Sequence, residues 1–161
     1  MINTKVTLAG VELKNPVMTA SGTFGSGAEY SEFVDLNKLG GVVTKGVANV
    51  PWPGNPTPRV TETASGMLNA IGLQNPGIDL FCKRDIPFLK QYDTKIIVNV
   101  CGKSTEDYCE VVERLAGATA VSVGTANFFN PYATVEIAEG IEKFMVQQKV
   151  EDISQIIGIV K

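Results

Sequence analysis

The sequence predicts an α/β protein built on a parallel β-sheet. Short apolar runs alternate with segments of helical periodicity, which is typical of βα repeats. Polar residues stand where several runs end, and parallel sheets bind ligands at the carboxyl ends of their strands. The four apolar runs are residues 16–20, 39–45, 95–100 and 118–123.

Composition favours one globular domain over residues 1–161, since 44% of the residues are hydrophobic. The net charge is −3 and Lys and Arg are not clustered, so nucleic acid and anionic membranes are poor partners. No apolar stretch is long enough to cross a bilayer, and residues 1–20 lack a secretory pattern. The three cysteines lack C-x-x-C spacing and indicate reduced thiols, so we expect a cytoplasmic protein.

The chain contains no histidine. This excludes Ser–His and Cys–His nucleophiles and every His-ligated metal centre, and we predict no metal site. Chemistry must come from Lys, Cys, hydroxyls, carboxylates or a cofactor.

The N-terminal segments precede the first polar candidates. Residues 4–13 alternate in polarity and predict a β-hairpin. The glycine-rich residues 21–27 lack G-x-G-x-x-G spacing. They fit a plain connector to a helix over 29–37 better than a loop whose N–H groups meet a polar ligand.

Lys45 closes the second apolar run, and Gly46 follows it. At a strand end, the lysine would place a mobile ammonium at the mouth of a site. The glycine would let a flat or anionic ligand approach the backbone. A surface lysine after a strand is an equally good interpretation.

The segment from residue 47 to residue 75 predicts no helix, because prolines crowd residues 51–58. It ends in Asn69-Ala-Ile-Gly-Leu-Gln-Asn75, where amides alternate with apolar residues. Amides suit a ligand with alternating N–H and C=O groups. Ordinary turn chemistry before the next helix is the alternative.

The remaining helices are predicted from caps and periodicity. A helix over 76–91 contains Pro87, which should kink or split it. Ser104 and Asp107 form a capping box for an amphipathic helix that ends at Gly117. A further helix follows residues 130–132, and a short one covers 150–157.

Polar candidates recur at the carboxyl ends of the predicted strands. A buried Asn99 inside an apolar run needs partners from a ligand or a core network. Gly124-Thr125 closes the last strand, either as a phosphate seat or as an ordinary βα loop. Because parallel strands end at one edge, we expect a single ligand site; its candidates are Ser21, Lys45, Asn99 and Thr125.

These residues also lie in stretches that resemble the class 1B dihydroorotate dehydrogenases, flavin mononucleotide (FMN) enzymes of pyrimidine biosynthesis. The matching stretches are residues 15–25, 43–46, 69–77, 97–100 and 121–131. The resemblance implies a β/α (TIM-type) barrel with an N-terminal hairpin under its base. It further implies oxidation of dihydroorotate to orotate, with electrons passed toward NAD by a partner subunit that carries FAD and an iron–sulfur cluster.

The resemblance also assigns the site. The implied FMN contacts are Ser21, Lys45, Gly46, Asn99, Gly124 and Thr125. The implied contacts to orotate or dihydroorotate are Lys45, Asn69, Ala70, Ile71, Gly72 and Leu73.

The chain departs from this family in length, because a complete barrel needs about 250 residues. Residues 1–115 resemble the family's beginning and 117–161 its last strand, helix and tail. The absent middle carries the family's catalytic cysteine, so we predict no catalytic residue and about half of the barrel strands. Cys101 does not match that cysteine and fits an inert small hydrophobe better than a base.

Two hypotheses follow for such a partial barrel. Two copies could associate as a homo-oligomer that completes the strand set, since few strands cannot close around a filled interior. Alternatively, the chain is a poorly folding remnant. For function, an internally deleted enzyme subunit is one hypothesis, and a non-catalytic flavin- or orotate-binding remnant or assembly module is the other.

Overall fold

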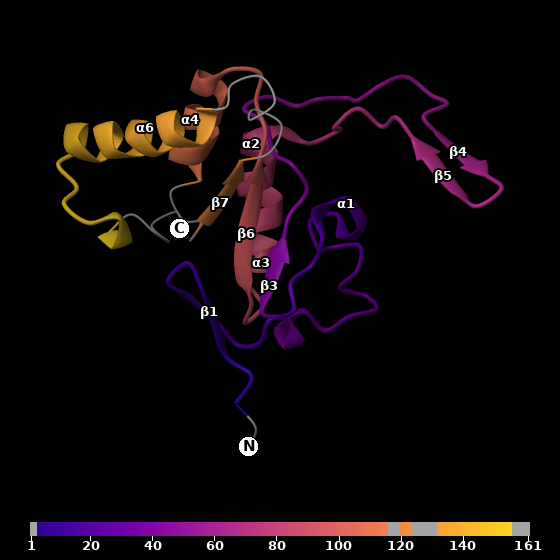
Figure 1. Cartoon of the computed structure of the whole chain (residues 1–161), viewed down its shortest axis with the longest axis horizontal. Coiled ribbons are helices and arrows are strands. Elements are labelled where there is room, and N and C mark those ends of the chain that lie inside the picture. The colour runs from indigo at the N-terminus through magenta and orange to yellow at the C-terminus, as the bar shows by residue number, and fades with distance from the viewer. Residues whose placement is uncertain (1–2, 116–119, 124–131, 156–161) are drawn as a thin grey trace.

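The computed structural model describes residues 3–115, 120–123 and 132–155. Its centre is a parallel sheet of three strands in the order β3-β6-β7 (Figure 1). The strands are β3 (Gly41–Val43), β6 (Lys95–Val100) and β7 (Ala120–Val123). The predicted α/β class and these three strands are confirmed. Within the described residues the sheet does not close into a barrel.

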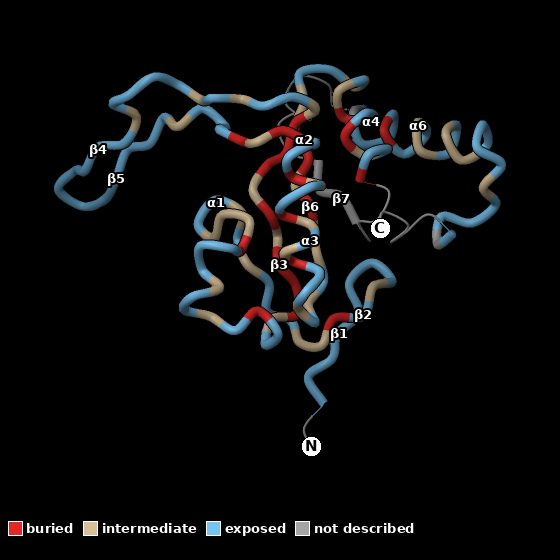
Figure 2. Tube along the Cα trace, turned by 180° about the vertical axis from the view of Figure 1, so that it is seen from behind, coloured by how far each residue is buried: buried red, intermediate tan, exposed pale blue. Residues whose placement is uncertain are grey.

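Helices cover one face of this sheet. They are α2 (Gly77–Leu80), a π-helical turn η2 (Phe81–Asp85), α3 (Ile86–Leu89), α4 (Thr105–Arg114) and α6 (Ala133–Gln147). Val98 and Val100 of β6 pack with Phe81 and Tyr108 from the helices in the main core. Figure 2 shows buried residues concentrated along β3, β6 and the adjoining helices. The intervening Ile97 and Asn99 are only half-buried, because they point to the opposite face.

The N-terminal hairpin is confirmed as β1 (Val6–Leu8) and β2 (Val11–Leu13). Its two-residue turn has positive φ at both Ala9 and Gly10, with values of 47° and 83°. Such turns match the right-handed twist of paired strands.

Two expectations for the following segment are wrong. Residues 16–20 make only an isolated parallel bridge, Met18 to Gly41, beside β3. Residues 29–37 form turns and a 3-10 turn η1 (Leu36–Lys38) instead of a helix, while the glycine-rich loop contains a short helix α1 (Ser21–Phe24). Asp35 explains part of this, because its side chain accepts a hydrogen bond from Asn37 N and so starts a new turn.

The absence of helix over residues 47–75 is confirmed. An unpredicted antiparallel hairpin, β4 (Val60–Thr63) and β5 (Gly66–Asn69), extends away from the sheet (Figure 1). Every residue of both strands is exposed, so no hydrophobic alternation marks them in the sequence.

The predicted helix over 76–91 is confirmed as the run α2-η2-α3. The π turn ends at Asp85, two residues before Pro87, which stands near the start of α3, where a missing N–H is tolerated. The predicted Ser104 cap forms, because Asp107 N donates to Ser104 Oγ over 3.2 Å. The Asp107 carboxylate accepts from Lys103 N over 2.8 Å, one residue before the position expected for a capping box.

The C-terminal prediction is correct for α6. The short helix expected over 150–157 is reduced to a 3-10 turn η3 (Ile153–Gln155), and its end lies outside the described residues. None of the described helices is sufficiently long and apolar to cross a membrane.

Asn75 is the buried amide that joins the long connection to the helices. Its Oδ1 accepts hydrogen bonds from Ala48 N at 3.1 Å and Gly77 N at 3.0 Å, and its Nδ2 donates to Leu73 O. We expect Asn75→Ala to lower the free energy of unfolding by about 2–4 kcal/mol, because two buried N–H groups lose their acceptor. Urea unfolding measures this. The exposed Gln91→Ala is the control, and equal stability of the two variants would contradict the role of Asn75.

Candidate functional site

The pairing of β3 with β6 continues past the end of β3. Val47 N donates to Asn99 O over 2.8 Å, and Cys101 N donates to Val47 O over 2.9 Å. Lys45 and Gly46 therefore lie directly beside the end of β6. This confirms that the chain brings these strand ends to one edge of the sheet.

Gly46 is buried where three segments meet. A Cβ built on it would lie 3.4 Å from Cys101 Sγ and 3.6 Å from the Leu73 Cδ1 methyl. The predicted residues Gly46 and Leu73 are thus close neighbours, and the glycine leaves its backbone approachable.

Ser21 and Asn99 are also brought together. Asn99 Nδ2 donates to Ser21 Oγ over 3.5 Å, and both residues are half-buried. Among the described residues, the Asn99 side-chain carbonyl has no hydrogen-bond donor. The amide therefore keeps an acceptor for a ligand on the face of the sheet that the helices leave uncovered.

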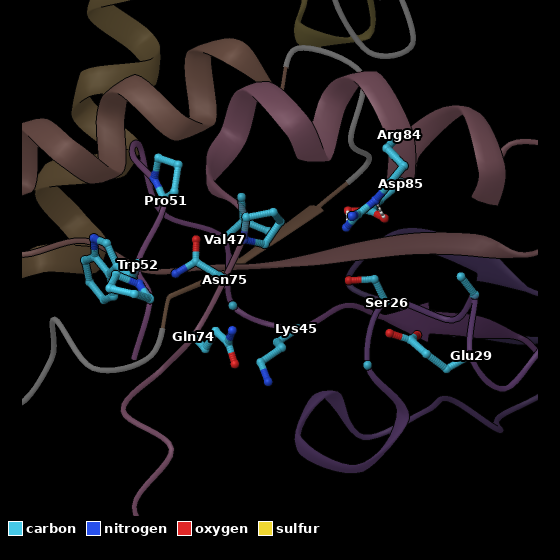
Figure 3. Close-up of a pocket in the computed structure, with 15 residues that line it drawn as sticks. Ser26, Glu29, Lys45, Val47, Pro51, Trp52, Gln74, Asn75, Arg84 and Asp85 are labelled. Atoms are coloured by element: carbon cyan, nitrogen blue, oxygen red, sulfur yellow. Dashed lines mark hydrogen bonds and ion pairs between the residues drawn. The ribbon is translucent and has the colours of Figure 1, made fainter. Parts of the chain in front are cut away.

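Lys45 lines a pocket of about 760 Å³ (Figure 3). Its backbone N donates to Gly25 O over 3.1 Å, which fixes the strand end against the glycine-rich loop. In the described part of the chain, the Lys45 ammonium makes neither a hydrogen bond nor an ion pair. The pocket is lined by residues 25–26, 28–29, 45–47, 51–53, 74–76 and 84–85. Since Ser21 and Asn99 do not line it, Lys45 and Gly46 form the junction between the pocket and the Ser21–Asn99 pair.

The stretch Asn69–Leu73 lies at the surface: Ile71 is half-buried, and its other four residues are exposed. Asn69 Oδ1 accepts from Ile71 N over 3.1 Å, so this amide makes a local turn. Gln74 and Asn75 likewise hydrogen bond within the chain. Hydrogen bonds within the chain thus engage all three amides, while Leu73 lies against Gly46. Ala70 and Gly72, which the resemblance also assigns to the substrate, lie in the sequence between Asn69 and Leu73. The candidates Gly124 and Thr125 lie outside the described residues.

Arg84 and Asp85 line the pocket and were not predicted. The Asp85 carboxylate is buried and accepts from Arg84 Nε at 2.9 Å and Nη2 at 3.0 Å. The hydrogen bond and charge of Asp85 raise the pKa of the Arg84 guanidinium. Adjacent residues of opposite charge resemble an ordinary exposed helix surface in sequence. Only the π turn, which rotates Asp85 into the protein, makes them part of a pocket.

Cys101 lies beneath Gly46 with 4% of its surface exposed. Burial raises the pKa of its thiol to about 11. The thiol is therefore protonated at neutral pH, as expected for an inert small hydrophobe. No cluster of three or more His, Cys, Asp or Glu suited to a metal ion occurs in the described ranges.

The fold and site together define an α/β sheet protein whose candidate ligand groups gather at the carboxyl ends of parallel strands. The family model for dihydroorotate dehydrogenase matches residues 3–116. The chain belongs to the dihydroorotate dehydrogenase family.

Its relatives include catalytic subunits named dihydroorotate dehydrogenase B (NAD+). The one from Alkaliphilus metalliredigens is 57% identical over 156 residues, covering 96% of this chain and 51% of the relative. The one from Alkaliphilus oremlandii is 52% identical over 175 residues, covering 99% and 58%. This chain thus spans about half the length of these relatives.

Alignment with the subunit from Lachnoclostridium phytofermentans shows how large the difference in length is. The two are 38% identical over 300 aligned positions, which cover 99% of this chain and 100% of the relative. Because this chain has only 161 residues, close to half of the aligned positions have no counterpart in it.

A solved structure of an Eimeria tenella dihydroorotate dehydrogenase in complex with ferulenol shares the fold. Its TM-score is 0.68 at 18% identity, and the match covers 89% of this chain and 45% of that one. The open sheet described above is therefore consistent with part of that larger fold.

The Cys101 thiol gives a direct test of the packing beneath Gly46. At pH 8, a pKa of about 11 leaves about one thiol in a thousand ionised, so alkylation by iodoacetamide should be far slower in folded than in urea-unfolded protein. Peptide mass spectrometry measures the rate for each cysteine. Burial raises the pKa of Cys82 and Cys109 as well, and these half-buried thiols serve as internal comparisons. Alkylation of Cys101 at the same rate in folded and unfolded protein would contradict its burial.

Proposed function

We propose that this chain binds FMN and orotate at the ends of β3 and β6 but does not itself oxidise dihydroorotate. One observation supports this most strongly. Backbone pairing beyond β3 holds the main chain of Lys45 and Gly46 beside Asn99, and within the described residues the Lys45 ammonium has no hydrogen-bond or ion-pair partner. A cation, a free amide carbonyl and an approachable glycine backbone suit the polar edge of a flavin ring and an anionic substrate.

The residues fit the cofactor in a specific way. Gly46 leaves space that a Cβ would fill against Cys101 and Leu73. The half-buried Ser21–Asn99 pair offers a hydroxyl and an amide from the same edge. Bound FMN would supply the hydride acceptor. Lys45 would stabilise negative charge, while Ser21, Gly46 and Asn99 would orient the ring, and Gly124 with Thr125 would hold the phosphate.

The orotate part of the proposal uses Lys45 and the stretch from Asn69 to Leu73. Leu73 already packs near Gly46, and the Lys45 ammonium would pair with the substrate carboxylate. Asn69 uses its Oδ1 in a local turn, and among the residues that the structure describes its Nδ2 group donates to none, so it remains a donor for a ligand.

The missing chemical step is proton removal. The family resemblance places the base in a loop for which this chain has no counterpart. Cys101 cannot replace it at neutral pH, because burial keeps its thiol protonated with a pKa of about 11. Loss of a general base commonly lowers rate by about 10²–10⁴-fold. Binding without efficient turnover is the expected outcome.

The alternative is a working subunit of a larger enzyme. Relatives are named as catalytic subunits of an NAD+-linked enzyme, which favours a cytoplasmic assembly with an electron-transfer subunit carrying FAD and an iron–sulfur cluster. Association of two copies is the other assembly we propose, since the described sheet is open. Formation of orotate from dihydroorotate with an added electron acceptor would favour the catalytic alternative.

Lys45→Ala tests the binding proposal. We expect purified protein to show flavin absorbance bands, and the variant to bind FMN and orotate about tenfold or more weakly because the site loses its cation. Equilibrium titration measures both affinities. Lys38→Ala is a matched control, because Lys38 is exposed just before the opposite end of β3. Unchanged affinity in Lys45→Ala, or no binding by the unaltered chain, would refute the proposal.

A further inference from the structure

The two chain segments that flank the β4–β5 hairpin are joined by separate backbone hydrogen bonds and by the side chains of Asn55 and Arg59. Residues 51–58 contain four prolines, which have no N–H and cannot form a continuous ladder. Asn55 instead donates twice across the gap, from its backbone N to Ile71 O at 2.9 Å and from its Nδ2 to Ala70 O at 2.8 Å. Ala70 N donates to Arg59 O over 2.8 Å. The segment proposed to bind orotate thus depends on the proline-rich segment for its shape.

Arg59 is at the centre of this junction. Its Nη2 donates to Gln74 Oε1 over 2.8 Å. Its Nη1 donates to Pro53 O and Asn55 O, each over 3.3 Å. The guanidinium therefore ties the bend at residues 53–55 to the far end of the stretch that contains Asn69–Leu73. Within the described residues it has no carboxylate partner, so its donors serve the chain's own carbonyl and amide oxygens.

The contact between the two segments is tight. A Cβ on Gly54 would lie 2.4 Å from Ile71 O and 2.9 Å from Arg59 Nη1. A Cβ on Gly72 would lie 2.7 Å from the Asn55 side chain. Both glycines also have positive φ, at 77° and 78°. The bend at residues 53–55, to which the guanidinium donates, is therefore packed directly against the backbone of residues 70–73.

We propose that Arg59 is a positioning residue for orotate: its planar fork fixes the stretch from Asn69 to Leu73 without touching the ligand. This inference rests on the proposed function and adds a residue that sets affinity for substrate but not for FMN. We expect different effects on orotate and FMN affinity because of where Arg59 lies. Within the described residues the Arg59 guanidinium hydrogen bonds to the exposed connection. Gly46 and Asn99 instead belong to the paired ends of β3 and β6, and Ser21 of α1 accepts a hydrogen bond from Asn99. Lysine cannot replace it, because one ammonium does not span two carbonyls and an amide as a guanidinium does.

The experiment compares orotate and FMN affinities of the unaltered chain, Arg59→Ala and Arg59→Lys. We expect both variants to bind orotate about tenfold more weakly and to change FMN affinity by about twofold or less. Millimolar guanidinium should restore orotate affinity in Arg59→Ala, with sodium chloride at equal ionic strength as the control. Lys143→Ala, which removes an exposed cation on α6, should leave both affinities unchanged.

Hydrogen exchange gives a readout that does not require ligand. Amides of residues 70–73 should exchange faster in Arg59→Ala, while those of β6 should not change. Three results would overturn the positioning role. They are an unchanged orotate affinity in Arg59→Ala, an unchanged orotate affinity in Arg59→Lys, and a loss of FMN affinity as large as the loss of orotate affinity. If the unaltered chain holds FMN but takes no orotate, the orotate part of the proposed function fails and the role of Arg59 with it. Absence of FMN binding would instead refute the wider proposal.

Discussion

The site depends on one constraint: the parallel pairing of β3 and β6 does not stop where the strands end. Two further hydrogen bonds, Val47 N to Asn99 O and Cys101 N to Val47 O, carry it onward. They place Lys45 and Gly46 beside Asn99 without help from any side chain. Because backbone bonds in a buried setting are costly to leave unmade, this arrangement is among the most firmly held parts of the chain.

The remaining structure supports this edge from one side. Val98 and Val100 anchor β6 among the helices, while Asn99 between them turns to the uncovered face. Asn75 secures the connection that returns toward Gly46. The buried Asp85 carboxylate and its exposed partner Arg84 line the pocket on the side of the π turn. The buried core thus lies behind the proposed flavin edge, whereas the β4–β5 hairpin is exposed along both strands.

Sequence reasoning succeeded where hydrophobic pattern or a defined cap controls the structure. The run 95–100 and the Ser104 cap were predictable because each carries a strong local signal. The helix expected over 29–37 failed because local polar turns, including that of Asp35, outweighed its pattern. β4 and β5 gave no signal because both of their faces are exposed. Asp85 was missed since its burial depends on a π turn, and Arg59 because its partners lie up to 15 positions away in the chain.

Trp52 permits the most direct test of a flavin site at this edge. It is the single tryptophan of the chain and lines the same pocket as Lys45, so its emission should report a flavin bound nearby. Titration of the purified chain with FMN, followed by tryptophan fluorescence, should show quenching that saturates at about one flavin per chain. Tryptophan emission that falls only in proportion to light absorbed by free FMN, with no saturation, would contradict the account.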